Sequence, residues 1–153
     1  MKRVVILGRG GAGKSTLARR LGAATALPVV ELDKHFWPED LTPIPKDRWV
    51  MIQRRLVSEP AWITDGDLGP YDVLEVRLAA ADTVIVLDFS VWRCGWRALL
   101  RSRENMAFWR WMIGYRRNSL PLVNAAIAEH AGHADVRVLR NPRDVEKLLA
   151  QAS

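Results

Sequence analysis

The chain has 153 residues, 49% of them hydrophobic, which predicts one domain over residues 1–153 with a sizeable core and no room for a second. Charges interrupt every apolar run well before the roughly 18 residues of a membrane-spanning helix. The N-terminus has no signal-peptide pattern and Cys94 is the single cysteine, so we expect a cytoplasmic protein with no membrane partner and no internal disulfide. Its 23 Lys and Arg against 17 Asp and Glu give a net charge of +6, which favours an anionic partner such as a nucleotide or a nucleic acid.

The first apolar run, residues 3–7, is followed by the most informative motif of the chain. Residues 8–15 read G-R-G-G-A-G-K-S, which fits the phosphate-binding pattern G-x-x-x-x-G-K-[ST]. Glycines let backbone N–H groups turn toward a di- or triphosphate, while Lys14 supplies a cation and Ser15 a hydroxyl for Mg²⁺. A helix predicted over residues 14–24 adds its N-terminal dipole. We expect ATP or ADP with Mg²⁺ to be bound by Gly8, Arg9, Gly10, Gly11, Ala12, Gly13, Lys14, Ser15 and Thr16.

Five short segments rich in β-branched residues occur along the chain, separated by stretches that can form helices. They are residues 4–7, 29–32, 62–64, 83–87 and 136–139. This alternation predicts parallel βαβ units and therefore a three-layer α/β/α sandwich. Between the second and third strands, Pro45 can open a helix that buries Trp49, Ile52 and Leu56 on one face. Pro121 breaks the long segment after the fourth strand.

Three acidic residues follow predicted strands, at the carboxyl ends where open α/β sheets bind ligands: Asp33, Asp65 and Asp88. One of them should accept a hydrogen bond from a metal-bound water behind Ser15, but periodicity does not choose among them. Asp65 with Gly66 is also a common turn pair, and Asp88 could instead cap a helix.

Further motifs together resemble a known class of proteins. They are Leu32-Asp33-Lys34 with Trp37, Asp65-Gly66-Asp67, Arg77 before Ala80-Ala81-Asp82, and Val86-Leu87-Asp88. In this order they resemble small P-loop kinases of the adenylate-kinase-like class, among them the proteins usually labelled DNA topology modulation protein. The resemblance covers nearly the whole chain, and it implies a P-loop NTPase fold with a five-stranded parallel sheet of order 2-3-1-4-5.

The resemblance also implies roles for the acids and for the arginines that follow the fourth strand. It favours Asp65 as the magnesium-side acid and places Asp33 in an acceptor pocket, where the carboxylate would orient or deprotonate the nucleophile. Arg97 matches an arginine that stacks on adenine, and Arg101 one that clamps phosphate at the lid. Arg77, Arg97 and Arg101 could equally be solvated residues on helix faces.

Residues 101–120 correspond by resemblance to the lid of these kinases and end near Tyr115-Arg116-Arg117. Arg116 and its neighbour would contact the transferred phosphoryl group, a task that can be worth roughly three to five orders of magnitude in rate. The segment is shorter than the lid of its relatives, so slow transfer or plain ATP hydrolysis stays open.

These observations favour an ATP-binding kinase that transfers the γ-phosphoryl group of ATP·Mg²⁺ to a small acceptor, such as a nucleoside monophosphate. The alternative is a nucleotide-dependent regulator that binds nucleic acid, with little or no kinase activity. Its support is the positive charge and the aromatic residues Trp92, Trp96, Trp109 and Trp111 interleaved with arginines. An intact Asp33 pocket facing the phosphate loop favours the kinase.

The three histidines add little to either hypothesis. His130 and His133 with Asp135 could be drawn as metal ligands, but zinc needs three or four convergent donors, so we expect surface residues at a helix end. His35 lies beside Asp33 and could line the acceptor pocket, although an ordinary loop histidine explains it as well.

Overall fold

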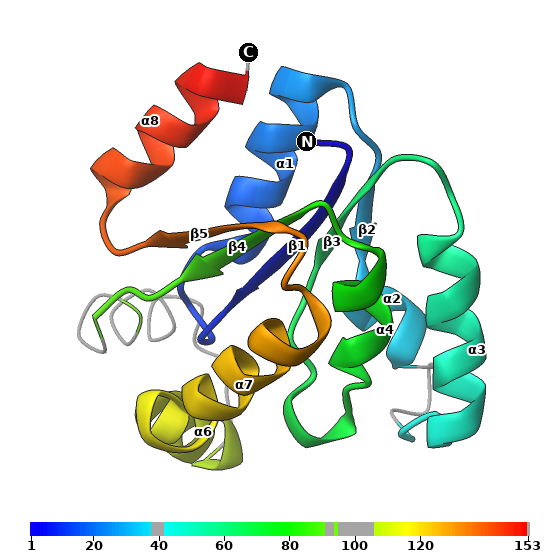
Figure 1. The fold of residues 1–153 in the computed structure, drawn as a ribbon. Helices are drawn as coiled ribbons and strands as arrows, with labels where there is room; N and C mark the ends of the chain where they lie inside the picture. Colours follow the sequence, from blue (N-terminus) through cyan, green and yellow to red (C-terminus); the bar gives the residue numbers. More distant parts are fainter. Residues whose placement is uncertain (38–41, 91–93, 95–105, 153) are drawn as a thin grey trace.

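The computed structural model describes residues 1–37, 42–90, 94 and 106–152. Its sheet is built from β1 (Arg3–Gly8), β2 (Val29–Glu31), β3 (Trp62–Asp65), β4 (Thr83–Leu87) and β5 (Asp135–Leu139). The strands pair in parallel in the order β2-β3-β1-β4-β5, with β1 in the centre (Figure 1). The predicted five-stranded parallel sheet and its strand order are therefore confirmed.

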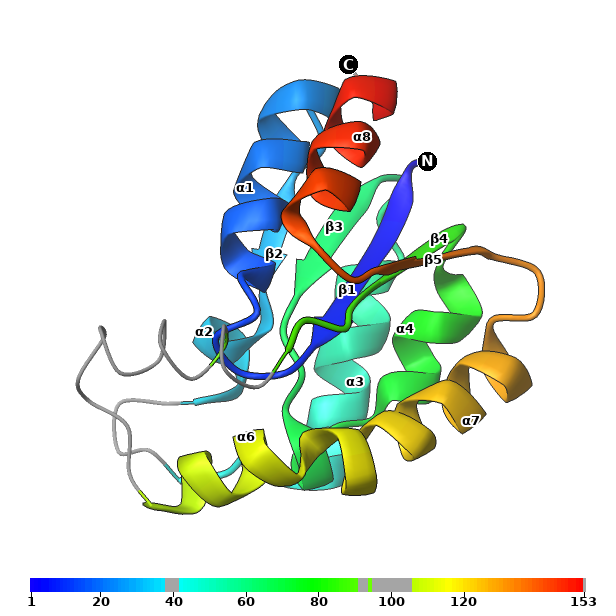
Figure 2. The same cartoon turned by 90° about the vertical axis from the view of Figure 1, so that its left-hand side faces the viewer.

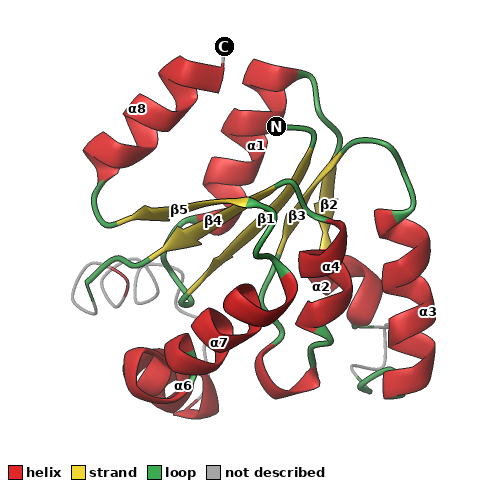
Figure 3. Cartoon of the chain, in the orientation of Figure 1, coloured by secondary structure: helices red, strands yellow, loops and turns green. Residues whose placement is uncertain are grey.

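Helices cover both faces of this sheet, as the three-layer prediction requires (Figures 1 and 3). They are α1 (Lys14–Thr25), α2 (Leu32–Phe36), α3 (Lys46–Val57), the short 3₁₀ helix η1 (Gly69–Tyr71), α4 (Leu74–Ala80), α6 (Met106–Asn118), α7 (Leu120–His130) and α8 (Pro142–Ala152). Helices α1 and α8 lie on one face, and α3, α4 and α7 lie on the other. Among the described residues, no helix combines the length and apolar character needed to cross a bilayer.

The alternation of side chains along the central strand divides the core into two layers. Val4 and Ile6 of β1 pack on the side of α1 and α8, whereas Val5 and Leu7 pack on the side of α4 and α7. Strand β1 has a neighbouring strand at each edge and a layer of helices on each face, so its apolar residues are fully buried. The sheet therefore gives the loop that follows β1 a rigid support.

Two predictions about helices are confirmed and one boundary is corrected. Pro45 precedes α3, whose Trp49 is fully buried in a third apolar cluster that also includes Ile52 and Leu56. Helix α6 ends before Pro121, which lies in the first turn of α7.

The correction concerns the second strand, predicted over residues 29–32. It ends at Glu31, because Leu32 and Phe36 are four residues apart and are buried together by a helical turn. Asp33 therefore lies in the first turn of α2 and not on a strand end.

Candidate nucleotide site

The loop of residues 8–15 requires glycine where its backbone turns. Gly8 ends β1 with φ of 147°, and a Cβ atom there would lie 2.7 Å from the carbonyl oxygen of Leu87. Gly13 has φ of 95° and accepts the first helical hydrogen bond from the N–H of Leu17, at 2.9 Å. These positions favour glycine, so the chain can turn from a central strand into α1 with its amide groups uncovered.

Lys14 is held over this loop by the loop's own backbone. Its Nζ donates to the carbonyl oxygen of Gly8 at 2.7 Å and to that of Arg9 at 3.2 Å. Burial lowers the pKa of Lys14, while the nearby carboxylates of Asp67 and Asp65 act in the opposite direction. The ammonium group is thereby fixed where the loop opens toward the acids.

The acids predicted at Asp33 and Asp65 both act on Lys14, together with Asp67. Asp65 ends β3 in register with Ile6 of β1, and its side chain makes no hydrogen bond within the described part of the chain. Asp65 is buried, at 6% exposure. The sheet therefore fixes its position, and no described residue occupies either carboxylate oxygen with a hydrogen bond.

Asp33 approaches the same cation from α2. Partial desolvation raises the pKa of its carboxyl group, as do the neighbouring Asp65 and Asp72, and the charge of Lys14 works against this rise. A carboxyl group with a raised pKa is a stronger base than an ordinary aspartate once it is ionised. His35, on the same short helix, is exposed.

Asp88, the third strand-end acid, is engaged elsewhere. Its carboxylate accepts two hydrogen bonds from Arg116, from Nε and from Nη2, each at 2.9 Å. This ion pair ties α6 to the end of β4, and the phosphoryl contact of Arg116 stays a prediction. Arg117, next along the helix, is exposed.

Two residues to which the sequence assigned no role, Asp67 and Tyr115, join α6 to the loop after β3. The Tyr115 hydroxyl donates to Oδ2 of Asp67 at 3.2 Å, while Oδ1 accepts the N–H of Gly69 at 3.0 Å. Burial and the Asp67 carboxylate raise the pKa of Tyr115. Helix α6 therefore lies beyond the carboxyl ends of β3 and β4 (Figure 2).

Arg77 is not the solvated residue that the sequence left open. It is completely buried and forms a two-pronged ion pair with Asp72, with nitrogen–oxygen distances of 2.7 and 2.9 Å. It also donates to the side chain of Gln53 at 2.9 Å and to the carbonyl of Gly66 at 3.4 Å. Because α4 packs between α3 and α7, Arg77 points inward and anchors the loop that follows Asp65.

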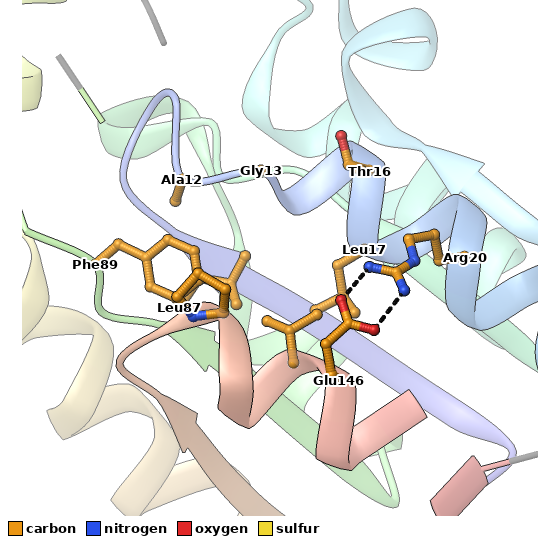
Figure 4. A pocket seen from close by; sticks show the side chains of 10 residues that line it. Ala12, Gly13, Thr16, Leu17, Arg20, Leu87, Phe89 and Glu146 are labelled. Carbon is orange, nitrogen blue, oxygen red and sulfur yellow. Dashed lines mark hydrogen bonds and ion pairs between the residues drawn. The ribbon is translucent and has the colours of Figure 1, made fainter. Parts of the chain in front are cut away.

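A pocket of about 120 Å³ opens beside the loop, on the face of the sheet that carries α1 and α8 (Figure 4). It is lined by Ala12, Gly13, Thr16, Leu17, Arg20, Leu87, Phe89, Pro142, Val145 and Glu146. Arg20 and Glu146 bridge it with a salt bridge of 2.7 Å between α1 and α8. Three of the predicted nucleotide-binding residues therefore line one cavity with an aromatic ring.

Several predicted site residues lie outside the described part of the chain: Arg97, Arg101 and residues 101–105 of the predicted lid, with Trp92 and Trp96. Trp109 of α6 packs against the core layer of α1 and α8. His133 Nε2 lies 3.0 Å from the carbonyl oxygen of Ala81, and His130 ends α7. Within residues 1–37, 42–90, 94 and 106–152, no three His, Cys, Asp or Glu side chains are grouped so that they could hold a metal.

No protein-family model matches the chain, and no curated protein matches it in sequence. Solved structures do match its fold. Shikimate kinase from Acinetobacter baumannii in complex with shikimate matches with a TM-score of 0.68 and 17% identity, over 99% of this chain and 90% of that one. A gluconokinase from Sinorhizobium meliloti 1021 matches with a TM-score of 0.60 and 18% identity, over 99% and 89%. Deoxyadenosine kinase from M. mycoides with bound dCTP matches with a TM-score of 0.55 and 15% identity, over 97% of both chains. The chain has the P-loop kinase fold.

Proposed function

We propose that this chain binds ATP·Mg²⁺ and transfers the γ-phosphoryl group to a small acceptor. The observation that supports it best is the cluster of Asp33, Asp65 and Asp67 acting on Lys14 at the mouth of the phosphate loop. A phosphate loop alone serves any nucleotide-binding protein, whereas phosphoryl transfer also needs a metal-side acid and a group that orients the nucleophile. The neighbours of this fold are themselves named as kinases.

The oxygen groups near the loop suit Mg²⁺, which prefers hydroxyl, carboxylate and water oxygens. Ser15 lies in the first turn of α1 with an exposed side chain, and the carboxylate of Asp65 has no competing hydrogen bond within the described residues. Ser15 would hold the ion and Asp65 would accept from one of its waters. Bound Mg²⁺ supplies charge neutralisation on the β- and γ-phosphates.

In this proposal the base of the nucleotide and the acceptor lie on opposite sides of Lys14. The base would enter the pocket of Figure 4, where Phe89 offers a ring face next to Ala12 and Gly13. The acceptor would lie against α2, where Asp33 orients its nucleophilic oxygen or takes its proton.

The test is an acceptor panel in which ADP formation from ATP·Mg²⁺ is followed with nucleoside monophosphates, nucleosides, sugars and small hydroxy acids. We expect one class to accelerate ADP formation in the wild type. Asp33→Asn should abolish this acceleration while ATP still binds, and Asp47→Asn should not change it, because Asp47 is exposed in the first turn of α3.

Lys14→Ala tests whether the phosphate loop binds the nucleotide. It should weaken ATP and ADP binding by at least about 2 kcal/mol, which is the scale of one charge-assisted hydrogen bond in a desolvated site. Equal nucleotide affinity in this variant, measured by titration calorimetry, would remove the loop from the mechanism. If ADP forms but no acceptor accelerates its formation, the activity is ATP hydrolysis and the kinase proposal is wrong.

A further inference from the structure

Arg9, the second residue of the phosphate loop, carries a buried charge whose guanidinium has no hydrogen-bond partner in the described part of the chain. Its side chain is 1% exposed, and within the described part of the chain none of its three guanidinium nitrogens forms a hydrogen bond. Its neighbour is the ring of Tyr115, whose centre lies 5.9 Å from the guanidinium carbon. A ring face offsets little of the cost of removing a guanidinium from water, so an arginine in this position favours a bound anion.

Arg77 shows how this fold pairs a buried guanidinium when its role is structural, although its Nε has no hydrogen bond within the described residues. Arg77 is also completely buried, and it has the carboxylate of Asp72 and the side-chain oxygen of Gln53 as partners. The two acids that act on Tyr115, the ring neighbour of Arg9, already have hydrogen-bond partners of their own. Asp67 accepts from Tyr115 and from the N–H of Gly69, and Asp88 is paired with Arg116.

The position of Arg9 indicates which anion it would hold. Its carbonyl oxygen accepts from Lys14, so the residue lies at the centre of the site. Its side chain extends to Tyr115 of α6, and it is not among the residues that line the pocket beside Ala12 and Thr16. The nucleotide phosphates would be cradled by backbone N–H groups at the start of α1, leaving the Arg9 side chain for a different group.

We propose that Arg9 binds an oxyanion, a carboxylate or a phosphate, carried by the acceptor. This inference rests on the proposed function and specifies its substrate class: the acceptor is anionic as well as nucleophilic. The planar fork of a guanidinium matches two oxygens of such a group.

The experiment uses inorganic phosphate as the probe and the full chain saturated with a non-hydrolysable ATP analogue and Mg²⁺. The analogue fills the phosphate loop, including the γ position, so any further phosphate must bind elsewhere. Phosphate replaces chloride at constant ionic strength, and its affinity is measured by titration calorimetry. We expect the wild type to bind phosphate and Arg9→Met to bind it about tenfold more weakly or worse, the effect typical of removing one charged hydrogen-bond partner.

Two matched variants make the result specific. Arg48→Met removes an equal charge from an exposed position on α3 and should leave phosphate affinity unchanged. Arg9→Lys keeps the charge but loses the fork, and it should give an intermediate affinity even if Arg9→Met does not fold. Without ligands, the urea midpoint of Arg9→Met should equal or exceed that of the wild type, because an unpaired buried charge has been removed.

The outcomes separate the two proposals. If the wild type does not bind the analogue, the proposed function fails, and the inference fails with it. If the analogue binds but phosphate does not, or binds Arg9→Met equally well, only the role of Arg9 is overturned. If Arg9→Met instead weakens the analogue relative to ADP, Arg9 holds the γ-phosphate of the nucleotide and the acceptor assignment is wrong.

Discussion

Asp65, Asp67 and Asp88 illustrate how tertiary contacts distinguish acids that a sequence treats alike. Asp88 is paired with Arg116, and Asp67 accepts from Tyr115, whereas the carboxylate of Asp65 has no hydrogen bond within the described residues. A metal-side acid must have an oxygen available for a metal-bound water. By that criterion Asp65 is the best candidate of the set.

Asp65→Asn therefore tests metal chemistry apart from nucleotide binding. The substitution keeps the shape but removes the charge, so we expect nucleotide affinity within a few-fold of the wild type and turnover lower by orders of magnitude. Calorimetry and single-turnover kinetics measure the two effects separately. Asp47→Asn, at an exposed position in the first turn of α3, should leave both nucleotide affinity and turnover unchanged. Reduced affinity with intact turnover per bound complex would make Asp65 a structural turn residue.

The residues of the phosphate loop could be predicted because each is required by local backbone geometry. A glycine at φ of 95° before α1 is visible in the sequence as a fixed position in a short motif. The contacts of Asp67 with Tyr115 and of Arg9 with the same ring join residues that are far apart in the chain, so no spacing predicts them. The burial of Arg77 could not be predicted for the same reason, since it depends on the packing of α3 and α7 around α4.

At the scale of the elements, the buried strands were the most predictable and the short ones the least. Residues 83–87 form β4 as predicted, because a continuous β-branched run between two helical layers has one stable arrangement. At β2, three residues of strand are followed directly by α2, and the choice between strand and helix depends on burying Leu32 with Phe36. Of the segment predicted as a lid, residues 106–118 form the helix α6, and their role as a lid stays a prediction.

The two ion pairs that fix elements near the site should differ greatly in their effect on stability. Asp72→Asn leaves the buried Arg77 without a countercharge and should lower the free energy of unfolding by about 3–5 kcal/mol. Arg116→Gln removes a pair whose arginine is exposed, so we expect only a small fraction of that decrease. Urea unfolding measures both variants. Similar decreases in both would contradict the structural role assigned to Arg77.

The ion pair between Asp72 and Arg77 also makes the stability of the fold decrease at low pH. Burial raises the pKa of Asp72, but the charge and hydrogen bonds of Arg77 outweigh it and leave the pKa lowered. The contribution is therefore present above the ordinary Asp pKa of about 3.9 and is lost as the pH falls through the lowered value.

At the scale of the whole molecule, the net charge of +6 makes some binding to DNA unavoidable at low salt. Exposed Arg110 and Arg117 on α6 contribute to it. The kinase proposal and the regulator alternative differ in how much of this affinity survives screening.

We expect weak DNA binding that disappears near 0.15 M ionic strength, with log K falling by about 0.9 per phosphate neutralised for each tenfold rise in salt. Fluorescence anisotropy over a salt series measures the slope. Tight binding that persists at this ionic strength and is abolished in an Arg116→Gln, Arg117→Gln double variant would favour the regulator. Such binding, together with ADP formation that no acceptor accelerates, would overturn the kinase proposal.

Both ends of the described chain lie on the side of the molecule where the parallel strands begin, opposite the phosphate loop (Figure 1). Lys2 leads into the first strand there, where its N–H donates to the carboxylate of Asp82, and α8 ends nearby at Ala152. A surface or a bead attached through either end would therefore leave the loop, the acids and α6 facing the solution. The molecule can be immobilised by its ends for surface-based binding measurements without obstructing its own site.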